Sequence, residues 1–153
     1  MCCDNLPSLC KVKEILQEKG NAVYSVEPDA TLLDALRLMA RQNIGVVLVV
    51  ENSKIVGIFS ERDCVYYLAS DEGCSLQAPV KQYMTSPVYY VTPDQTLEDC
   101  MVVMTAKSIR HLPVLNEDDL AGIISIGDVV KTIIGEKDAS IKDLENFLWV
   151  NLI

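Results

Sequence analysis

Apolar positions along the chain follow two spacings, and each spacing predicts a different kind of element. In residues 32–42 they recur every three or four positions, the pattern of an amphipathic helix with one buried stripe. Residues 46–50 form an unbroken apolar run rich in valine, which predicts a buried strand. The polar residues 51–54 then predict a hairpin turn, followed by a second strand over 55–59 and a helix over 60–70.

The same pattern occurs a second time in residues 91–128, at a constant offset of 65 positions from residues 26–63 and without a gap. The positions that are identical in the two copies are, numbered in the first, Val26, Pro28, Asp29, Thr31, Leu32, Asp34, Met39, Ile44, Val49, Gly57, Ile58, Ser60 and Asp63. Each copy predicts the order β-α-β-β-α. Two copies of one small unit are expected to pack about a pseudo-twofold axis, which creates paired clefts for ligands.

The predicted fold class is therefore α+β, with two such repeats and short helices at both ends of the chain. A helix over 12–19 precedes the first copy, and a short element over 80–84 precedes the second. The expected organisation is repeat 1 over 8–70, a linker over 71–79, repeat 2 over 80–135 and a C-terminal helix over 136–153.

The C-terminal segment is apolar on more than one side of its predicted helix. Ser140 and Asp143 resemble a capping box, and the apolar residues that follow include Phe147, Trp149 and Ile153. Two interpretations are open: an added helix that covers the core, or a surface for self-association.

Composition narrows the range of partners. The chain has 153 residues, half of them apolar, and a formal net charge of −9. This charge argues against binding to nucleic acid or to an anionic membrane, because both need a basic surface. A small anionic ligand is still compatible, since a helix N-terminus and a few local cations suffice to bind one. No apolar run approaches the ~20 residues of a membrane-spanning helix, and the first ten residues do not resemble a secretory signal, so the expected location is the cytoplasm.

The six cysteines do not form a recognisable metal motif, because none has paired CxxC spacing or a nearby histidine. Free thiols are the expectation for a cytoplasmic protein, and no metal cofactor is expected. Cys100 replaces Ala35 of the first copy, which indicates a small buried residue. Cys2, Cys3 and Cys10 are unusually dense, and a redox role for them stays open.

Catalytic motifs are absent from the sequence, so the protein is not expected to be an enzyme. There is no G-x-S-x-G, H-E-x-x-H, Walker loop or G-x-G-x-x-G. Cys64, which follows Asp63, is the only cysteine worth considering as a nucleophile beside the single histidine, His111.

The motifs V-x-P-D-x-T-L-x-D, I-R-H-L-P-V and G-I-I-S-x-x-D resemble those of the CBS (cystathionine-β-synthase) domain. Two CBS domains in tandem resemble a Bateman module. The motifs S-E-R-D in the first copy and S-I-G-D-V-V in the second are similar to those of small stand-alone CBS-pair proteins. The resemblance covers residues 12–134. It implies binding of an adenosine compound such as AMP, ATP, NAD or S-adenosylmethionine, with AMP favoured, and disc-like homodimers of CBS pairs.

The resemblance also implies that each ligand site takes its base wall from one copy and its ribose-phosphate wall from the other. In the family the Asp of S-x-x-D binds the ribose hydroxyls, which here means Asp63 and Asp128. Both lie where a strand becomes a helix, and the alternative is that they are plain helix caps.

One composite site is predicted to be the better of the two. Its expected residues are Val26, Leu32, Ile44, Gly45 and Val46 around the base, and Arg110, His111, Ser125 and Asp128 on the other wall. Gly45 leaves room for the base, and Arg110 and His111 offer charge to a phosphate. The weaker mirror site would comprise Val91, Leu97, Ile109, Arg110 and His111 opposite Ser60, Arg62 and Asp63. His111 could instead be a structural histidine, and Arg62 could pair with Glu61 or Asp63 on the surface.

The leading hypothesis is a regulatory module that binds an adenine nucleotide and signals to an unknown regulated protein. The alternative is an interaction or redox-partner scaffold that acts through the apolar tail and the N-terminal cysteines.

Overall fold

The computed structural model describes residues 10–135, which divide into two compact units. The first unit is residues 22–89, and the second combines residues 10–21 with residues 90–135. The C-terminal helix predicted over 136–153, and the thiols of Cys2 and Cys3, lie outside the described residues.

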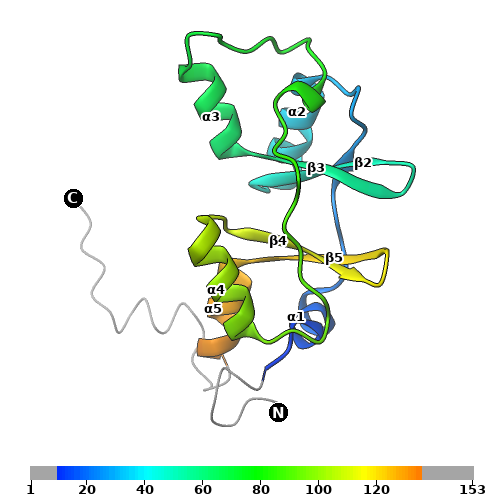
Figure 1. The fold of residues 1–153 in the computed structure, drawn as a ribbon, viewed down its shortest axis with the longest axis vertical. Helices are drawn as coiled ribbons and strands as arrows, with labels where there is room; N and C mark the ends of the chain where they lie inside the picture. The colour runs from blue at the N-terminus through cyan, green and yellow to red at the C-terminus, as the bar shows by residue number, and fades with distance from the viewer. Residues whose placement is uncertain (1–9, 136–153) are drawn as a thin grey trace, which may run out of the picture. The chain divides into compact units, whose positions relative to one another are not determined.

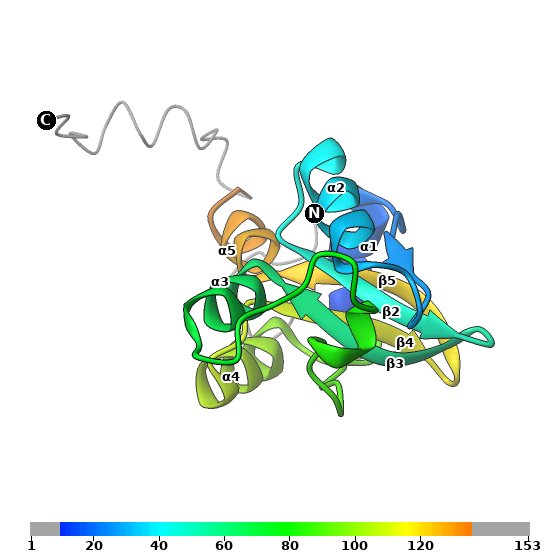
Figure 2. The same cartoon turned by 90° about the horizontal axis from the view of Figure 1, so that it is seen from above.

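The first unit is a three-stranded sheet with helices on one face. Its elements are β1 (Ser25–Val26), α2 (Leu32–Gln42), β2 (Val46–Glu51), β3 (Lys54–Ser60), α3 (Glu61–Ala69) and the 3₁₀ helix η1 (Val80–Gln82). The sheet order is β1-β2-β3, with β1 parallel and β3 antiparallel to β2. Both α2 and α3 lie on the same side of the β2–β3 hairpin (Figure 1), and the hairpin turn points away from α3 (Figure 2).

Helix α2 has the bounds that its apolar spacing predicts, 32–42. The Thr31 hydroxyl caps it by accepting the Asp34 N–H at 3.1 Å, and Asn43 ends it in the left-handed conformation at φ 52°. Its stripe of Leu32, Ala35 and Met39 is buried in the core against β2 and β3. The local sequence pattern therefore sets the bounds of α2, and the burial of its apolar stripe stabilises the helix.

The second unit repeats this plan with one strand fewer. Its elements are α1 (Val12–Lys19), α4 (Leu97–Lys107), β4 (His111–Asn116), β5 (Asp119–Ser125) and α5 (Ile126–Gly135). Strands β4 and β5 form an antiparallel hairpin, and α1, α4 and α5 lie on one side of it (Figure 1). The core of this unit includes Leu97, Leu112 and Ile124.

The order β-α-β-β-α predicts that the second copy also begins with a strand, over 88–91. This prediction is wrong beyond a single parallel bridge from Val91 to Val114. In the first unit the Leu48 N–H donates to the Tyr24 carbonyl and extends β1. The residue equivalent to Leu48 in the second copy is Pro113, which has no N–H to donate. This missing donor explains why β1 has no full counterpart.

The segments that precede each copy pack on the opposite copy. Helix α1 belongs to the second unit, where the Val12 N–H donates to the Gln95 carbonyl at 3.0 Å. Likewise η1 belongs to the first unit, where the Val80 N–H donates to the Ala30 carbonyl at 2.8 Å. The repeat spacing does not tell which copy a leading segment will cover. The sequence boundaries of 8–70 and 80–135 remain a prediction.

Cysteine chemistry differs along the chain. Cys64, Cys74 and Cys100 are free thiols, as expected. Cys10 is disulfide-bonded, so the expectation of a free thiol is wrong for this residue.

In residues 10–135 no group of His, Cys, Asp or Glu is arranged to hold a metal ion. None of the helices in this range is long and apolar enough to cross a membrane.

Candidate functional site

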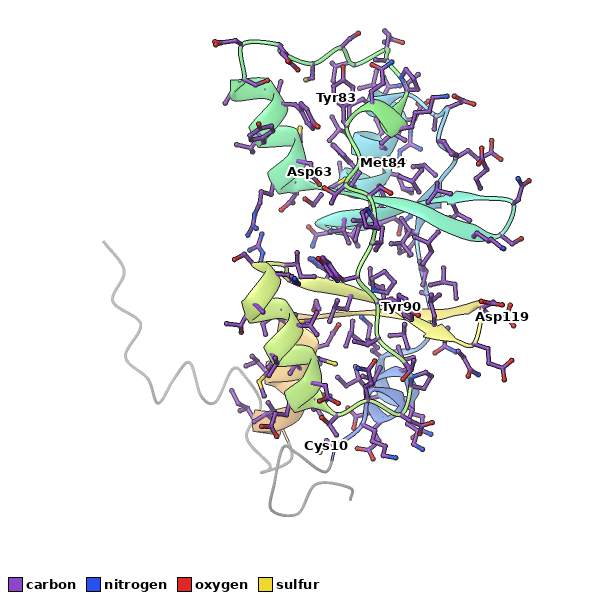
Figure 3. The ribbon with its side chains drawn as sticks, in the orientation of Figure 1. Cys10, Asp63, Tyr83, Met84, Tyr90 and Asp119 are labelled. Atoms are coloured by element: carbon purple, nitrogen blue, oxygen red, sulfur yellow. The ribbon has the colours of Figure 1, made fainter. Side chains whose placement is uncertain are left out.

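The S-x-x-D motif of the first unit forms a reciprocal cap at the start of α3. The Asp63 carboxylate accepts the Ser60 N–H at 2.8 Å and the Ser60 hydroxyl at 2.7 Å, both on Oδ2. The Asp63 N–H donates back to Ser60 Oγ at 3.3 Å. Thr85 adds a third bond, because its hydroxyl donates to Asp63 Oδ1 at 3.1 Å. Figure 3 shows Asp63 at the base of α3, close to Met84 and so to this neighbouring segment.

The S-x-x-D motif of the second unit has the same cap and a different third partner. Asp128 Oδ2 accepts the Ser125 N–H at 2.7 Å, and the Asp128 N–H donates to Ser125 Oγ at 3.1 Å. The Lys19 ammonium, at the end of α1, donates to the same Oδ2 at 2.7 Å and to the Ile123 carbonyl at 2.8 Å. The pair is partly shielded, with side-chain exposures of 32% for Lys19 and 23% for Asp128.

This ion pair keeps Asp128 ionised. Burial raises the pKa of the Asp128 carboxyl, but the hydrogen bonds and charge of Lys19 and the bonds from Ser125 outweigh it. The pKa of Asp128 therefore lies below its ordinary value. An ionised carboxylate is a pure acceptor, which is the state that sugar hydroxyls need from it.

The two carboxylates differ in how many acceptor positions they leave open. A carboxylate offers about four lone pairs on its two oxygens. At Asp63, Oδ2 accepts two bonds and Oδ1 accepts the Thr85 hydroxyl. At Asp128, Oδ2 accepts the Ser125 N–H and the Lys19 ammonium, and the Ser125 side chain also stabilises the carboxylate; within residues 10–135 no hydrogen bond to Oδ1 is described. Asp128 is therefore better prepared to accept two hydroxyl hydrogens from one ligand.

Backbone contacts bring the predicted ribose-phosphate wall together inside the second unit. His111 pairs with Ser125 across the β4–β5 hairpin. The Arg110 carbonyl accepts the Ile126 N–H, the first of α5, at 2.8 Å. Arg110 is exposed and His111 half-buried. The loop before β4 and the N-terminus of α5, which carries Asp128, are thus adjacent.

In the first unit the loop before β2 and the N-terminus of α3 are adjacent in the same way. Val46 pairs with Ser60, and the Gly45 carbonyl accepts the Glu61 N–H at 3.0 Å. Gly45 and Ile44 are half-buried, and Val46 is 8% exposed.

Other predicted base-wall residues lie deeper. Leu32, Val91 and Leu97 are at most 1% exposed and belong to the cores of their units. Val26 and Ile109 pack partly buried against these cores.

The first unit places its arginine differently. Arg62 is exposed in the first turn of α3, next to Asp63. Its equivalent in the second unit is Gly127, which is also exposed. The second unit instead has its cation at Lys19, whose equivalent in the first unit is Met84. The two units therefore differ in which element supplies a positive charge near the S-x-x-D carboxylate.

Sequence reasoning did not identify Lys19 or Thr85. Both residues come from segments that are exchanged between the copies, so neither is near its carboxylate in the sequence. A signal was present at Lys19, because a lysine ends a predicted helix just before Gly20. Its target could not be read from spacing alone.

The Cys64 thiol, next to Asp63, and the Cys100 thiol are not activated as nucleophiles. Burial, followed by the nearby Cys74, raises the pKa of Cys64. The pKa of Cys100 rises to about 11, mainly through burial and further through Asp99. Both groups are therefore protonated thiols at neutral pH, the less reactive form.

Comparison with known proteins gives a consistent result. The family model described as the CBS domain matches residues 12–70 and 80–135. The CBS domain-containing protein YhcV of Bacillus subtilis is 32% identical over 107 residues, which cover 70% of this chain and 76% of that protein. The crystal structure of a CBS-domain containing protein from Agrobacterium tumefaciens is 40% identical, with a TM-score of 0.77, and covers 81% of this chain and 93% of that one.

A more distant structure shares the fold. The CBS domain pair of protein MJ0100, solved with 5′-methylthioadenosine and S-adenosyl-L-methionine, has a TM-score of 0.72 at 22% identity. It covers 83% of this chain and 98% of that one.

Proposed function

Because this chain belongs to the CBS-domain family and carries two CBS repeats, we propose that it is a regulatory module that binds an adenosine-containing ligand. The ligand is an adenine nucleotide, with AMP favoured over ATP and NAD. No catalytic step is part of the proposal. The cytoplasmic location expected from the sequence stays a prediction.

The open acceptor face of Asp128 is the observation that carries this proposal. A ribose has two neighbouring hydroxyls, and the two lone pairs of Asp128 Oδ1 match them. The adjacent N-terminus of α5 favours an anionic group through its backbone N–H groups and its dipole. One ribose and one phosphate are the minimum that this combination recognises.

The base is proposed to contact the loop of the first repeat. Gly45 lacks a side chain, and Ile44, Val46 and Val26 are apolar, so they suit the flat face of an adenine. MJ0100, which shares the fold, was solved with two adenosine compounds, and this supports the proposed ligand class. A ligand that contacts both repeats would favour one arrangement of the pair, and this differential binding is the proposed signal.

The mirror site is proposed to be weaker. It would use Asp63 with Ser60 and Arg62, together with Val91, Ile109 and the bulkier loop of the second repeat. Thr85 already occupies one acceptor position of Asp63. A ribose there would have to displace this hydroxyl.

Calorimetric titration of nucleotide-free protein with AMP, ATP, NAD and S-adenosylmethionine tests the proposal. Binding of at least one of them at micromolar concentration is the expected result. Mass spectrometry of the protein as purified is the control, because a retained ligand would mask binding. Absence of binding by all four compounds to verified nucleotide-free protein would reject the function.

The module is also proposed to form homodimers. Helix α3 exposes Val65, Tyr66 and Leu68 at 64%, 68% and 62%. Three large apolar side chains on one short helix are more than scattered surface residues, and they suit burial against a second copy.

A further inference from the structure

Lys19 holds a position at the candidate site that no sequence motif marks. Its ammonium lies 2.7 Å from Asp128 Oδ2 and 2.8 Å from the Ile123 carbonyl, so it is fixed by two acceptors. An ammonium has three hydrogens to donate. Within residues 10–135 two of them have acceptors, and the third remains for a ligand.

This arrangement places a donor beside an acceptor. Asp128 Oδ1 can accept a hydroxyl hydrogen, and the Lys19 ammonium, bonded to Oδ2 of the same carboxylate, has a third hydrogen for a hydroxyl oxygen. A vicinal diol offers both functions at once, since each hydroxyl donates one hydrogen and accepts others. A single hydroxyl, as in a deoxyribose, can donate to Asp128 and accept from Lys19, but it supplies one hydrogen fewer to the two lone pairs of Oδ1. It also loses the Lys19 bond if the missing hydroxyl is the one that faces Lys19.

The equivalent position of the first unit cannot do this. Met84 stands where the second unit has Lys19, and a thioether donates no hydrogen bond. Thr85 contributes a hydroxyl there, but its hydrogen is already directed at Asp63 Oδ1. The difference between the two units is therefore one of ligand chemistry as well as of charge.

We propose that Lys19 is a specificity-determining residue that contacts the ligand at the Asp128 site and selects a ribose diol over a deoxyribose. The inference rests on the proposed function, because it assigns a role within that same site. Both ribose hydroxyls are expected to donate to Asp128 Oδ1, while Lys19 donates to the oxygen of one of them. The ligand class becomes a ribonucleotide with both hydroxyls free.

The test compares AMP with 2′-deoxy-AMP and 3′-deoxy-AMP by calorimetric titration at pH 7.5. Wild-type protein should bind AMP about tenfold more tightly than at least one of the deoxy compounds, the size expected for one hydrogen bond to a charged group. In Lys19→Met, which copies the residue of the first unit, AMP should lose about tenfold in affinity. The affinity for that deoxy compound should change less than threefold, so discrimination is lost.

Three controls make the outcome interpretable. Lys19→Arg keeps a donor and should retain most of the discrimination. Lys13→Met makes the same change at another lysine of α1, whose ammonium pairs with Asp94 at 3.0 Å, and should leave the ratio of AMP to deoxy-AMP affinity unchanged. Thermal midpoints of all variants establish that each protein is folded at the temperature of titration.

The possible failures are distinct. If wild-type protein binds AMP and both deoxy compounds equally, the role of Lys19 is rejected while the proposed function stands. Equal losses for AMP and the deoxy compounds in Lys19→Met would also reject it, since they indicate a structural or purely electrostatic role. A gain in AMP affinity would show that Lys19 competes with the ligand for Asp128. No binding of any adenine nucleotide to wild-type protein would reject both proposals.

Discussion

Asp63 and Asp128 occupy the same place in the same motif, yet they have different partners beyond the helix cap. Each caps its helix through a serine three residues earlier. Thr85 then fills an acceptor position of Asp63, whereas Lys19 fixes the charge of Asp128 and leaves Oδ1 open. The difference arises from residues that are distant in the sequence, so it becomes visible only in the folded unit.

The Lys19–Asp128 pair should make stability depend on pH. The pKa of Asp128 is lowered in the folded state, so its contribution is fully present above its ordinary value of 3.8 and is lost as the pH falls through the lower folded value. Urea unfolding between pH 2.5 and 7 should show that wild-type protein loses more stability on acidification than Lys19→Met. At pH 7 a double-mutant cycle with Asp128→Asn should give a coupling of about 1 kcal/mol, since the pair is only partly shielded. Parallel pH profiles for wild-type protein and Lys19→Met would contradict the assignment.

At the scale of elements, α1 and α2 show how far local pattern reaches. Both have the predicted bounds, because their apolar spacing and end residues act within the helix itself. The strand expected over 88–91 fails because it needed a donor from Pro113, which lies in another strand. The packing of α1 and η1 on the opposite copy could not be predicted from the sequence either, because it depends on which sheet each segment covers.

The glycines that recur in the two copies mark where the exchanged segments contact the sheets. A Cβ on Gly57 would overlap the Met84 side chain, and one on Gly122 would lie 2.7 Å from Leu16 Cδ2. A side chain at either position would require the facing Met84 or Leu16 side chain to move. Glycine here serves packing rather than a special backbone angle.

Gly57→Ala should destabilise the protein by about 1–3 kcal/mol through overpacking against Met84. Met84→Ala should lower stability on its own account, by removing a partly buried side chain. The double variant should be more stable than the sum of the two losses predicts, by at least about 0.5 kcal/mol, because the clash is absent. Chemical unfolding of the four proteins measures this term. Simple additivity would show that Met84 does not pack on β3.

At the scale of the whole molecule, the family and the α+β plan follow from the repeat and its motifs. The pairing of the two repeats around a ligand remains a proposal, because it needs contacts that neither unit contains by itself. The alternative of an interaction or redox scaffold rests chiefly on the apolar tail and the first cysteines. Those residues lie outside the described range.

The proposed homodimer is testable through α3. Tyr66→Glu adds a charge to the exposed apolar surface and should shift the molar mass from that of a dimer toward that of a 16.9 kDa monomer. Size-exclusion chromatography with light scattering at several concentrations measures the change. Lys54→Glu, at the exposed start of β3 in the same unit, is the matched control. A monomeric wild-type protein, or a dimer that tolerates Tyr66→Glu, would contradict the assignment of this surface.

The central claim concerns the choice between two equivalent carboxylates, and one matched comparison tests it most directly. Titration of nucleotide-free wild-type protein, Asp63→Asn and Asp128→Asn with AMP applies the same chemical change at the same motif position. Asp128→Asn should weaken binding at least about tenfold, and Asp63→Asn less than about threefold. The opposite order, or equal losses in two folded variants, would contradict the account.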